Sequence, residues 1–351
     1  MSIWSTTSSL NVGRAYLAGC GTVTAALSVG GATNSGISSI NTCEKWNGSI
    51  WTITGTLSSG VIAPGTVGTV SSALCIGGYN QSSNIYYNQN WNGSSWSTAN
   101  AQPTLVLQFF AVAGIPSNAL AFGGVQFGSA TAYTLNWNGS AWLTLSSLLT
   151  QFVYQGGCGT YTSALCVGGS TGPSFVPSTS CEKWLGSVWT TISSLNAIGT
   201  GNACGDTNNA LAINGSSSNS SEVWNGFNWA ISSSYHILNS DSNFAVCGTY
   251  NAALAFGGNT GSSYINSTEI WILHAYNITG TVIKDNINLT SYTVYLIDRN
   301  SGILVATTNT NGSGLYSFIV YDNTTQYQVI TLDTVSLEFN AVIQSRVVGE
   351  Y

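Results

Sequence analysis

Four glutamates offer the first candidate chemistry, because a carboxyl group can act as a general acid, a general base or a nucleophile. Each stands two residues before a tryptophan. Glycoside hydrolysis requires two carboxyl groups that converge on one bond, whereas these recur once per repeat and so belong to different repeats. We therefore expect a structural role, in which each carboxylate accepts backbone hydrogen bonds. The four are Glu44, Glu182, Glu222 and Glu269.

Other catalytic or cofactor sites lack the residues that they need. A sialidase-type site requires several arginines, but residues 1–273 contain only Arg14. A copper oxidase site requires paired histidines, and His236 is the only histidine in that range. No phosphate-binding loop, dinucleotide fingerprint or Gly-x-Ser-x-Gly motif occurs in a usable context. The sequence therefore predicts no enzyme, no cofactor and no metal.

The eight cysteines fall at three repeated positions rather than in pairs. No Cys-x-x-Cys pair occurs, which argues against a zinc site. Free cysteines are usually buried and behave as small apolar side chains, so we expect unpaired core thiols in a protein that folds in a reducing cytoplasm. Cys20, Cys158, Cys204 and Cys247 share one position, Cys75 and Cys166 a second, and Cys43 and Cys181 a third.

Charge is sparse, with 5% charged residues and a net charge of −6. A nucleic-acid-binding surface needs clustered lysines and arginines, and residues 1–273 hold only Arg14, Lys45 and Lys183. No stretch approaches the roughly 18 apolar residues of a membrane span, and the N-terminus lacks the basic and apolar regions of a secretory signal. We expect neither nucleic-acid binding nor membrane insertion.

An internal repeat organises residues 1–273. The segment Ala-Leu-x-x-Gly-Gly recurs with leucines 47, 46, 45, 46 and 43 residues apart, and the fifth copy ends in Asn-Gly. A hairpin with a tryptophan at each end follows, such as Trp46-Asn-Gly-Ser-Ile-Trp51. Asn-Gly predicts a two-residue turn with positive φ at both residues. Each repeat thus predicts four strands, which in the first repeat are 16–22, 25–30, 42–46 and 51–54.

The sixth copy is divided between the two ends of this array. It supplies Trp271 without a second tryptophan, while the segment Trp4–Leu10 matches Trp189–Leu195 inside the array. In an open solenoid a divided repeat brings no advantage. In a closed ring, the N-terminal strand completes the last sheet and covers its exposed edge. The sequence predicts an all-β fold with a six-bladed β-propeller over residues 1–273, closed by the N-terminal strand.

The repeat combines a strand that ends in Gly-Gly with a later aromatic residue and a tryptophan. This combination resembles the kelch family of propellers, which implies blades of four antiparallel strands. Two features depart from that family: the interval between the aromatic residue and the tryptophan is shorter here, and the first aromatic is tryptophan instead of tyrosine. The resemblance concerns architecture, and one architecture hosts many functions.

Residues 274–351 form a second predicted domain, because they contain no tryptophan yet carry half of the charged residues. Short segments with alternating apolar residues predict a β-sandwich. The segments Gly280-Thr-Val and Thr310–Phe318 resemble the carboxypeptidase-regulatory or transthyretin-like family, which implies a small Ig-like sandwich. The predicted strands are 278–283, 292–298, 303–308, 315–321, 327–332 and 340–347.

Two features are similar to virion proteins of tailed phages: the C-terminal run Phe339–Val348 and the Trp-Asn-Gly-Ser-x-Trp hairpins. The resemblance implies a non-enzymatic structural protein in a tail fibre, a tail tip or a capsid decoration. It implies assembly in the host cytoplasm, attachment of residues 274–351 to other virion proteins, and an oligomeric state in the particle. A cellular kelch-type adhesin or lectin at the cell surface is the alternative. A glycan-cleaving enzyme is a third hypothesis, which the scattered carboxylates disfavour.

The loops after strands two and four vary most between repeats, and we expect them to share one face of the propeller. Aromatic side chains on uncharged polar loops suit stacking on a host-surface glycan or contact with a host-surface protein. The simpler interpretation is that several of them pack beneath their own loops. The candidate binding residues are Tyr79, Tyr86, Tyr87, Phe127, Phe175, Tyr235, His236 and Tyr264.

Overall fold

The structure is a computed structural model in which every regular element described is a β-strand. The chain divides into two compact units, one of Trp4–Ile272 and one of Met1–Ile3 with Leu273–Tyr351. In the part of the chain described, no helix is long and apolar enough to cross a membrane. The described residues are 2–33, 38–80, 85, 87–101, 108–172, 174–197, 199, 201–214, 220–232, 243–260, 263–273, 276–284, 287–298, 304–320, 327–331 and 344–347.

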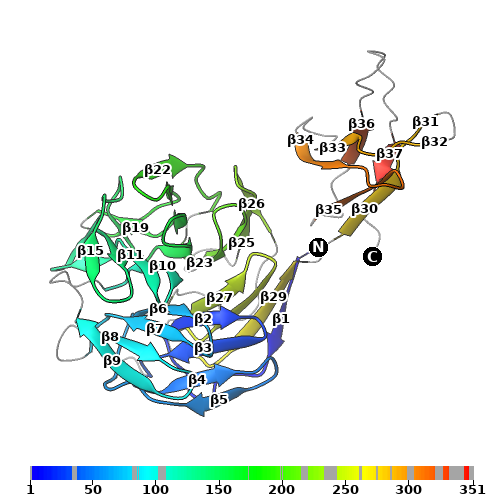
Figure 1. The fold of residues 1–351 in the computed structure, drawn as a ribbon. Helices are drawn as coiled ribbons and strands as arrows, with labels where there is room; N and C mark the ends of the chain where they lie inside the picture. The colour runs from blue at the N-terminus through cyan, green and yellow to red at the C-terminus, as the bar shows by residue number, and fades with distance from the viewer. Residues whose placement is uncertain are drawn as a thin grey trace. The chain divides into compact units, whose positions relative to one another are not determined.

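Six four-stranded antiparallel sheets, counted over the described residues before position 274, share one design (Figure 1). Consecutive strands pair as hairpins, so each sheet is built almost entirely from neighbouring sequence. The first three sheets consist of β2 (Ala18–Thr22), β3 (Ala25–Val29), β4 (Cys43–Trp46) and β5 (Trp51–Thr54); β6 (Gly65–Gly68), β7 (Ala73–Ile76), β8 (Tyr87–Trp91) and β9 (Trp96–Ala101); and β10 (Ala111–Ile115), β11 (Asn118–Phe122), β14 (Thr134–Trp137) and β15 (Trp142–Thr144).

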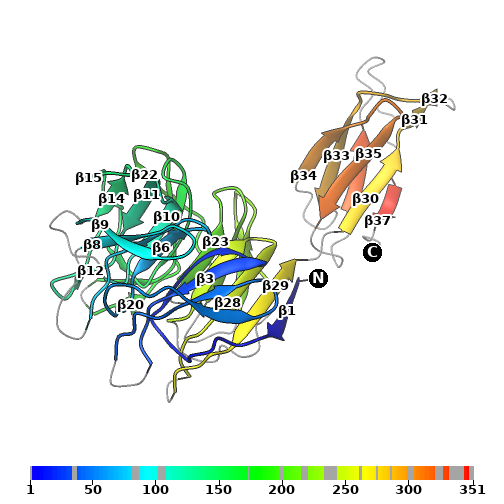
Figure 2. The same ribbon diagram turned by 60° about the horizontal axis from the view of Figure 1, so that its bottom comes forward.

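The sixth sheet differs from the others because its last strand comes from the N-terminus. Strand β1 pairs with β29, so the sheet has the order β1-β29-β28-β27, and Figures 1 and 2 both show β1 beside β29. The remaining sheets consist of β17 (Gly156–Gly159), β18 (Ala164–Val167), β21 (Cys181–Trp184) and β22 (Trp189–Ile192); β23 (Gly201–Gly205), β24 (Ala210–Asn214), β25 (Ser221–Trp224) and β26 (Trp229–Ile231); and β27 (Ala245–Thr249), β28 (Ala252–Phe256), β29 (Thr268–Leu273) and β1 (Ser2–Thr7).

The first strands of these sheets contact one another in sequence. Strand β2 contacts β6, β6 contacts β10, and the series continues through β17 and β23 to β27, which also contacts β2. Short ladders flank the sheets. They are formed by β12 (Val125–Gln126) with β13 (Ser129–Ala130), and by β16 (Phe152–Val153) with β19 (Ser170–Thr171) and β20 (Val176–Pro177).

A pair of tryptophans, one on the third strand and one on the fourth, packs together in each sheet. The ring centroids of Trp46 and Trp51 lie 5.4 Å apart, and those of Trp4 and Trp271 lie 5.3 Å apart, as the sequence match predicted. The first tryptophan of each pair donates Nε1–H to a carbonyl in the turn between the first two strands of its own sheet, at 2.9 Å from Trp46 to Val23. The aromatic packing and the hydrogen bond of the first indole thus hold the third and fourth strands of each sheet together.

The second tryptophan of a pair links its sheet to the preceding one. Trp51 donates Nε1–H to the Thr268 hydroxyl at 3.0 Å, and Trp189 donates to the Thr134 hydroxyl at 2.8 Å. Cys43 occupies the same position beside Trp96, whose Nε1 has no hydrogen-bond partner among the described residues. The position lies near the start of the third strand, and the bond between sheets forms where a threonine or serine stands there.

The predicted turn chemistry of the tryptophan hairpins is wrong in detail. Gly48 has a φ of 96°, whereas Asn47 is not among the described residues with positive φ. The Asn47 N–H donates to the Ile50 carbonyl, so the central turn residues are Gly48 and Ser49. The Asn47 side chain is the reason, because its Oδ1 accepts the N–H groups of Ser49 and Ile50 at 3.0 Å each.

The described residues of the C-terminal unit form three sheets, and the two larger ones share one core that includes Ile278, Leu296 and Phe318. Gly280 pairs with Tyr316, and a Cβ at position 280 would collide with the Tyr316 ring. Glycine is therefore required there, since the ring covers the backbone. The strands are β30 (Tyr276–Thr281) with β35 (Leu315–Val320); β34 (Leu304–Asn309), β33 (Thr293–Asp298), β36 (Tyr327–Thr331) and β37 (Gln344–Val347); and the hairpin β31 (Ile283–Lys284) with β32 (Ile287–Asn288).

Candidate binding site

The predicted binding residues lie in several environments. Tyr79, Phe175 and Tyr264 are half-buried, whereas Phe127 is 93% exposed on the β12–β13 turn. Tyr87 belongs to β8, although its side chain is not described. Three further candidates lie outside the described residues, namely Tyr86, Tyr235 and His236.

An aromatic cluster joins the three half-buried candidates to residues that the sequence analysis missed. The Phe109 ring lies 4.6 Å from that of Tyr154, 5.7 Å from that of Tyr79 and 6.0 Å from that of Tyr16. Tyr264 contacts Tyr16 and Phe175 contacts Tyr154, each at 6.2 Å between centroids. The rings thus form one connected group, in which Phe109 has the most neighbours.

Tyr16, Phe109 and Tyr154 share a repeat position, five residues before a glycine that is the last or next-to-last residue of the first strand of the sheet. All three have left-handed backbones, with φ of 57°, 54° and 59°. Such φ values are uncommon for bulky side chains. The same position carries Ala63 at 50° and Asn243 at 83°. The strand predicted over 16–22 begins at Ala18, so the prediction was wrong for Tyr16, which precedes the strand.

Hydrogen bonds between repeats explain this backbone conformation. The Tyr16 N–H donates to the Asn243 carbonyl at 2.7 Å, and the Ala63 N–H donates to the Tyr16 carbonyl at 2.8 Å. The Tyr154 N–H donates to the Phe109 carbonyl at 3.1 Å. Each bond turns the chain out of the extended conformation just before the first strand. A signal for these residues existed in the sequence, since the fixed spacing to the glycine identifies the position in every repeat.

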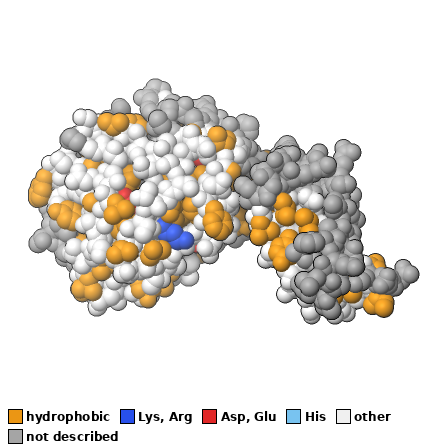
Figure 3. Space-filling view, turned by 90° about the horizontal axis from the view of Figure 1, so that it is seen from above, with side chains coloured by type: hydrophobic (Ala, Val, Ile, Leu, Met, Phe, Trp, Pro, Cys, Tyr) orange, Lys and Arg blue, Asp and Glu red, His pale blue; other side chains and the backbone are white. Residues whose placement is uncertain are grey.

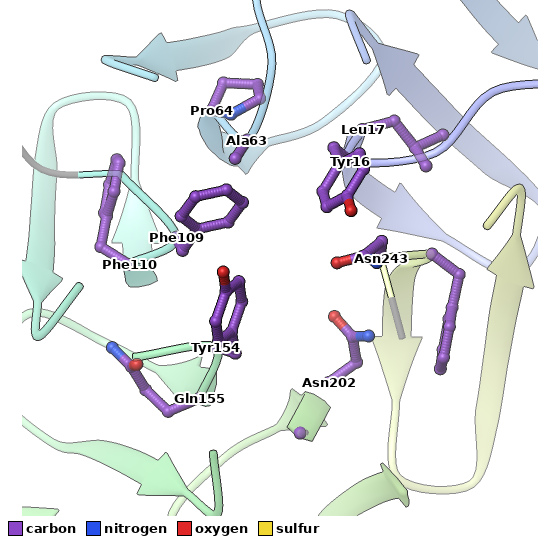
Figure 4. A pocket seen from close by; sticks show the side chains of 12 residues that line it. Tyr16, Leu17, Ala63, Pro64, Phe109, Phe110, Tyr154, Gln155, Asn202 and Asn243 are labelled. Carbon is purple, nitrogen blue, oxygen red and sulfur yellow. The ribbon is translucent and has the colours of Figure 1, made fainter. Parts of the chain in front are cut away.

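These residues surround a cavity of about 120 Å³. Its wall takes two consecutive residues from each of the six repeats. We call it the aromatic–amide cavity after its defining side chains. Figure 4 shows Phe109 and Tyr154 on one side, and the Tyr16 hydroxyl turned toward the Asn243 amide. The defining side chains are Tyr16, Phe109, Tyr154, Gln155, Asn202 and Asn243. A second cavity of about 150 Å³ adjoins it and shares Leu17, Pro64, Phe110, Gln155 and Asn202.

Gln155 contributes a buried amide to both cavities. Its side chain is only 5% exposed, and Nε2 donates to the Phe122 carbonyl at 2.7 Å. This bond fixes the orientation of the amide group. Among the described residues, Oε1 has no hydrogen-bond partner. Figure 4 shows this amide turned away from the centre of the cavity, so Gln155 supports the wall instead of presenting a free acceptor to the space.

None of the twelve cavity-lining residues carries a formal charge. Burial raises the pKa of Tyr154 and of Tyr264, and burial together with neighbouring phenols raises the pKa of Tyr79 to about 12. The phenols are therefore neutral near pH 7 and can donate or accept hydrogen bonds. The face in Figure 3 likewise shows only small spots of charged side chains.

The repeated glutamates accept backbone hydrogen bonds, as predicted for Glu44, Glu182 and Glu222. Glu182 accepts the N–H groups of Leu149 and Thr150 at 2.9 Å each, and both donors follow the last strand of the preceding sheet. Glu44 also forms a fully buried ion pair with Arg14 at 2.6 Å. These carboxylates are buried away from the cavity lining and tie neighbouring sheets together.

All eight cysteines are unpaired and buried, as the repeat pattern predicted. Burial raises the pKa of the Cys20 thiol to about 12 and of the Cys43 thiol to about 11. Within the described residues, no group of three or more His, Cys, Asp or Glu side chains could hold a metal ion. The thiols thus fill space between strands.

Comparison with known proteins leaves the chain without an assigned family. No protein-family model matches it, and no curated protein sequence matches it significantly. The similarity to kelch propellers, transthyretin-like sandwiches and phage virion proteins therefore stays a prediction from the quoted motifs.

Proposed function

We propose that residues 1–273 form a kelch-like six-bladed propeller that the N-terminal strand closes. The series of contacts between first strands returns from β27 to β2, which supports a ring. Trp4 occupies the second-tryptophan position of the sheet that contains Trp271. A ring removes the exposed sheet edges that an open array of the same sheets would present.

The function that this arrangement favours is recognition without catalysis. The observation that carries the proposal is the aromatic–amide cavity, to which every repeat contributes and in which no side chain is charged. A hydrolytic site needs a positioned acid, base or nucleophile, whereas this lining offers rings, amides and neutral phenols. Concave sites with apolar walls and a few fixed polar groups are typical of ligand binding.

The proposed context is the surface of a tailed-phage particle. The propeller would present its cavity to the host surface, and residues 274–351 would attach the chain to other virion proteins. Two features support this division: the C-terminal resemblance to virion proteins, and the concentration of half of the charged residues in that segment. Charged side chains in a protein interface set orientation and specificity more than affinity.

Purified particles from a culture that produces this chain test the proposal. We expect the full chain to sediment with intact particles and an antibody against residues 1–273 to label their surface. Residues 274–351 expressed alone should incorporate into particles, whereas residues 1–273 alone should not. Recovery of the chain only in the cell envelope would contradict the virion context and favour the adhesin. Incorporation of the isolated propeller at the level of the full chain would contradict the assignment of the attachment domain.

A further inference from the structure

We propose that the aromatic–amide cavity binds one neutral sugar ring, the terminal residue of an uncharged glycan. This inference rests on the recognition function proposed above and names the ligand class of that site. Three features support it: the size of the cavity, the chemistry of its wall and the rigidity of its backbone.

The size of the cavity and of its neighbour together suits a single ring. An apolar cavity of about 150 Å³ accepts a benzene molecule, and the aromatic–amide cavity is slightly smaller at about 120 Å³. A sugar ring with its hydroxyl groups is larger than benzene, so it would also enter the adjoining cavity of about 150 Å³, which extends the space toward the first strands of the sheets. Both are smaller than the roughly 300–1,000 Å³ of drug-sized sites. A longer glycan would therefore insert only its end.

The wall offers the two surfaces that a sugar ring needs. Phe109 and Tyr154 present aromatic rings, against which the C–H face of a sugar can pack. Asn202 and Asn243 present amides, which can both donate to and accept from hydroxyl groups. The Tyr16 hydroxyl, which Figure 4 shows turned toward the Asn243 amide, can likewise donate to or accept from a ligand hydroxyl group.

Other ligand classes match the wall less well. A carboxylate, phosphate or ammonium group would enter without a charged partner, because none of the lining residues is charged. Such desolvation without pairing is costly. An apolar ring would fill the space but would remove the Asn202 and Asn243 amides from water without offering them a hydrogen bond. A neutral ring that carries hydroxyl groups satisfies both conditions.

The aromatic side chains are held in place before any ligand binds. Tyr16, Phe109 and Tyr154 each take part in a backbone hydrogen bond between repeats and adopt a left-handed backbone. A residue in that conformation persists only where its surroundings fix it. Fixing the wall in advance lowers the entropy that binding must overcome.

The test measures binding of methyl glycosides to the full chain by saturation-transfer NMR and calorimetry. The neutral probes are the methyl glycosides of glucose, galactose, mannose and N-acetylglucosamine. Glucuronic acid and sialic acid glycosides are the acidic probes, and toluene is the apolar probe. We expect saturable binding of at least one neutral probe, and at least tenfold weaker binding of the acidic probes and of toluene.

Asparagine replacements then locate the site. Asn243 shows that asparagine adopts the left-handed backbone at this repeat position, so Phe109→Asn and Tyr154→Asn remove a ring without demanding a new backbone. We expect each to weaken binding about tenfold or more, and Asn243→Gly, which removes an amide, to weaken it about fivefold. Phe127→Asn is the matched control, because Phe127 has a φ of 51° but is 93% exposed and outside the cavity. Melting curves verify that every variant is folded.

Four results would overturn the inference. These are the absence of binding by every neutral probe at 20 mM or so, a preference for an acidic probe, a preference for toluene, and unchanged affinity in Phe109→Asn, Tyr154→Asn and Asn243→Gly. If the full chain still labels the particle surface in any of these cases, the ligand class fails while the virion context stands. If the neutral probe binds at the cavity but the chain is absent from particles, the ligand class stands while the virion context fails.

Discussion

The indole Nε1 of Trp4 donates to the hydroxyl of Ser221 at 3.4 Å, although 217 positions separate the two residues. The equivalent bond from Trp51 reaches Thr268, which also lies 217 positions later in the chain. A residue next to the N-terminus is thus bonded as the repeated tryptophans inside the array are. The N-terminal segment therefore occupies the place of the fourth strand in the last sheet.

The series of tryptophan bonds is interrupted at Trp96, Trp142 and Trp229, and the case of Trp142, between the second and third sheets, leaves the most polar atoms unpaired. Asn88 occupies the acceptor position there, and neither of its side-chain amide atoms has a partner among the described residues. Trp142 Nε1 also lacks one, while its ring packs in the same cluster as Ile76, the residue that pairs with Asn88. Thr134 and Thr268 show that a threonine at this position accepts the indole bond.

We therefore predict that Asn88→Thr stabilises the protein by about 1 kcal/mol, because it provides an acceptor and removes two buried unpaired atoms. The free energy of unfolding in urea measures the effect. The reverse change, Thr134→Asn, serves as the control and should destabilise by about 1–3 kcal/mol. Equal or lower stability of Asn88→Thr would mean that the two sheets are not joined by the repeated bond.

The glutamates give a matched pair of predictions. Glu44→Gln leaves the Arg14 guanidinium buried without a counter-charge, since both side chains of the ion pair are 0% exposed. Breaking a buried pair in this way costs about 3–5 kcal/mol. Glu182 has no such partner in the described hydrogen bonds, and Gln89 at the equivalent position already accepts the Ser58 N–H. We expect Glu182→Gln to cost only about 1–3 kcal/mol, because the amide keeps one acceptor oxygen but turns its NH2 group toward the second backbone N–H.

The pH dependence of stability tests Glu182 further. Burial raises the pKa of Glu182 above its ordinary value of 4.5, and this outweighs the backbone hydrogen bonds that lower it. The folded state then binds the proton more tightly than the unfolded state, so stability falls as pH rises from 4.5 through the raised pKa. Glu182→Gln should flatten this decrease in urea titrations between about pH 4 and pH 7. An unchanged profile would show that Glu182 does not titrate in that window.

The thiols should be unreactive in the native protein. All eight are buried, and burial raises the pKa of Cys20 to about 12 and of Cys43 to about 11. Since the thiolate is the reactive form, we expect an aromatic disulfide reagent at pH 8 to modify no thiol within minutes and all eight in guanidinium chloride. Rapid modification of several thiols without denaturant would show that the sheets open readily.

The sequence predicted the elements that repeat and missed those that depend on neighbouring repeats. Trp4 could be matched to Trp189 because both the residue type and the flanking segment recur. The left-handed backbone of Tyr16 could not be foreseen from local preference, because tyrosine favours strands. Its cause is a hydrogen bond to Asn243, far along the chain. The cavity was missed for the same reason.

The candidate binding residues show a similar division. Tyr79 and Tyr264 were identified as loop aromatics, and both join the cluster around Phe109 and Tyr16. Phe127 fits the same description in sequence but lies exposed on a turn. Residue type and loop position cannot separate these cases, because the separation depends on which loops of different repeats converge.

The most direct test of the closed ring is the thermal melting of residues 11–351 with and without a peptide of residues 1–10. Removing the buried Trp4 and its strand should cost at least about 3 kcal/mol, which lowers the melting temperature by roughly 10 °C in a domain of this size. Excess peptide should raise it again by mass action, and the same peptide with Trp4→Ala should not. A shortened chain that melts with the full chain and ignores the peptide would contradict closure by the N-terminal strand.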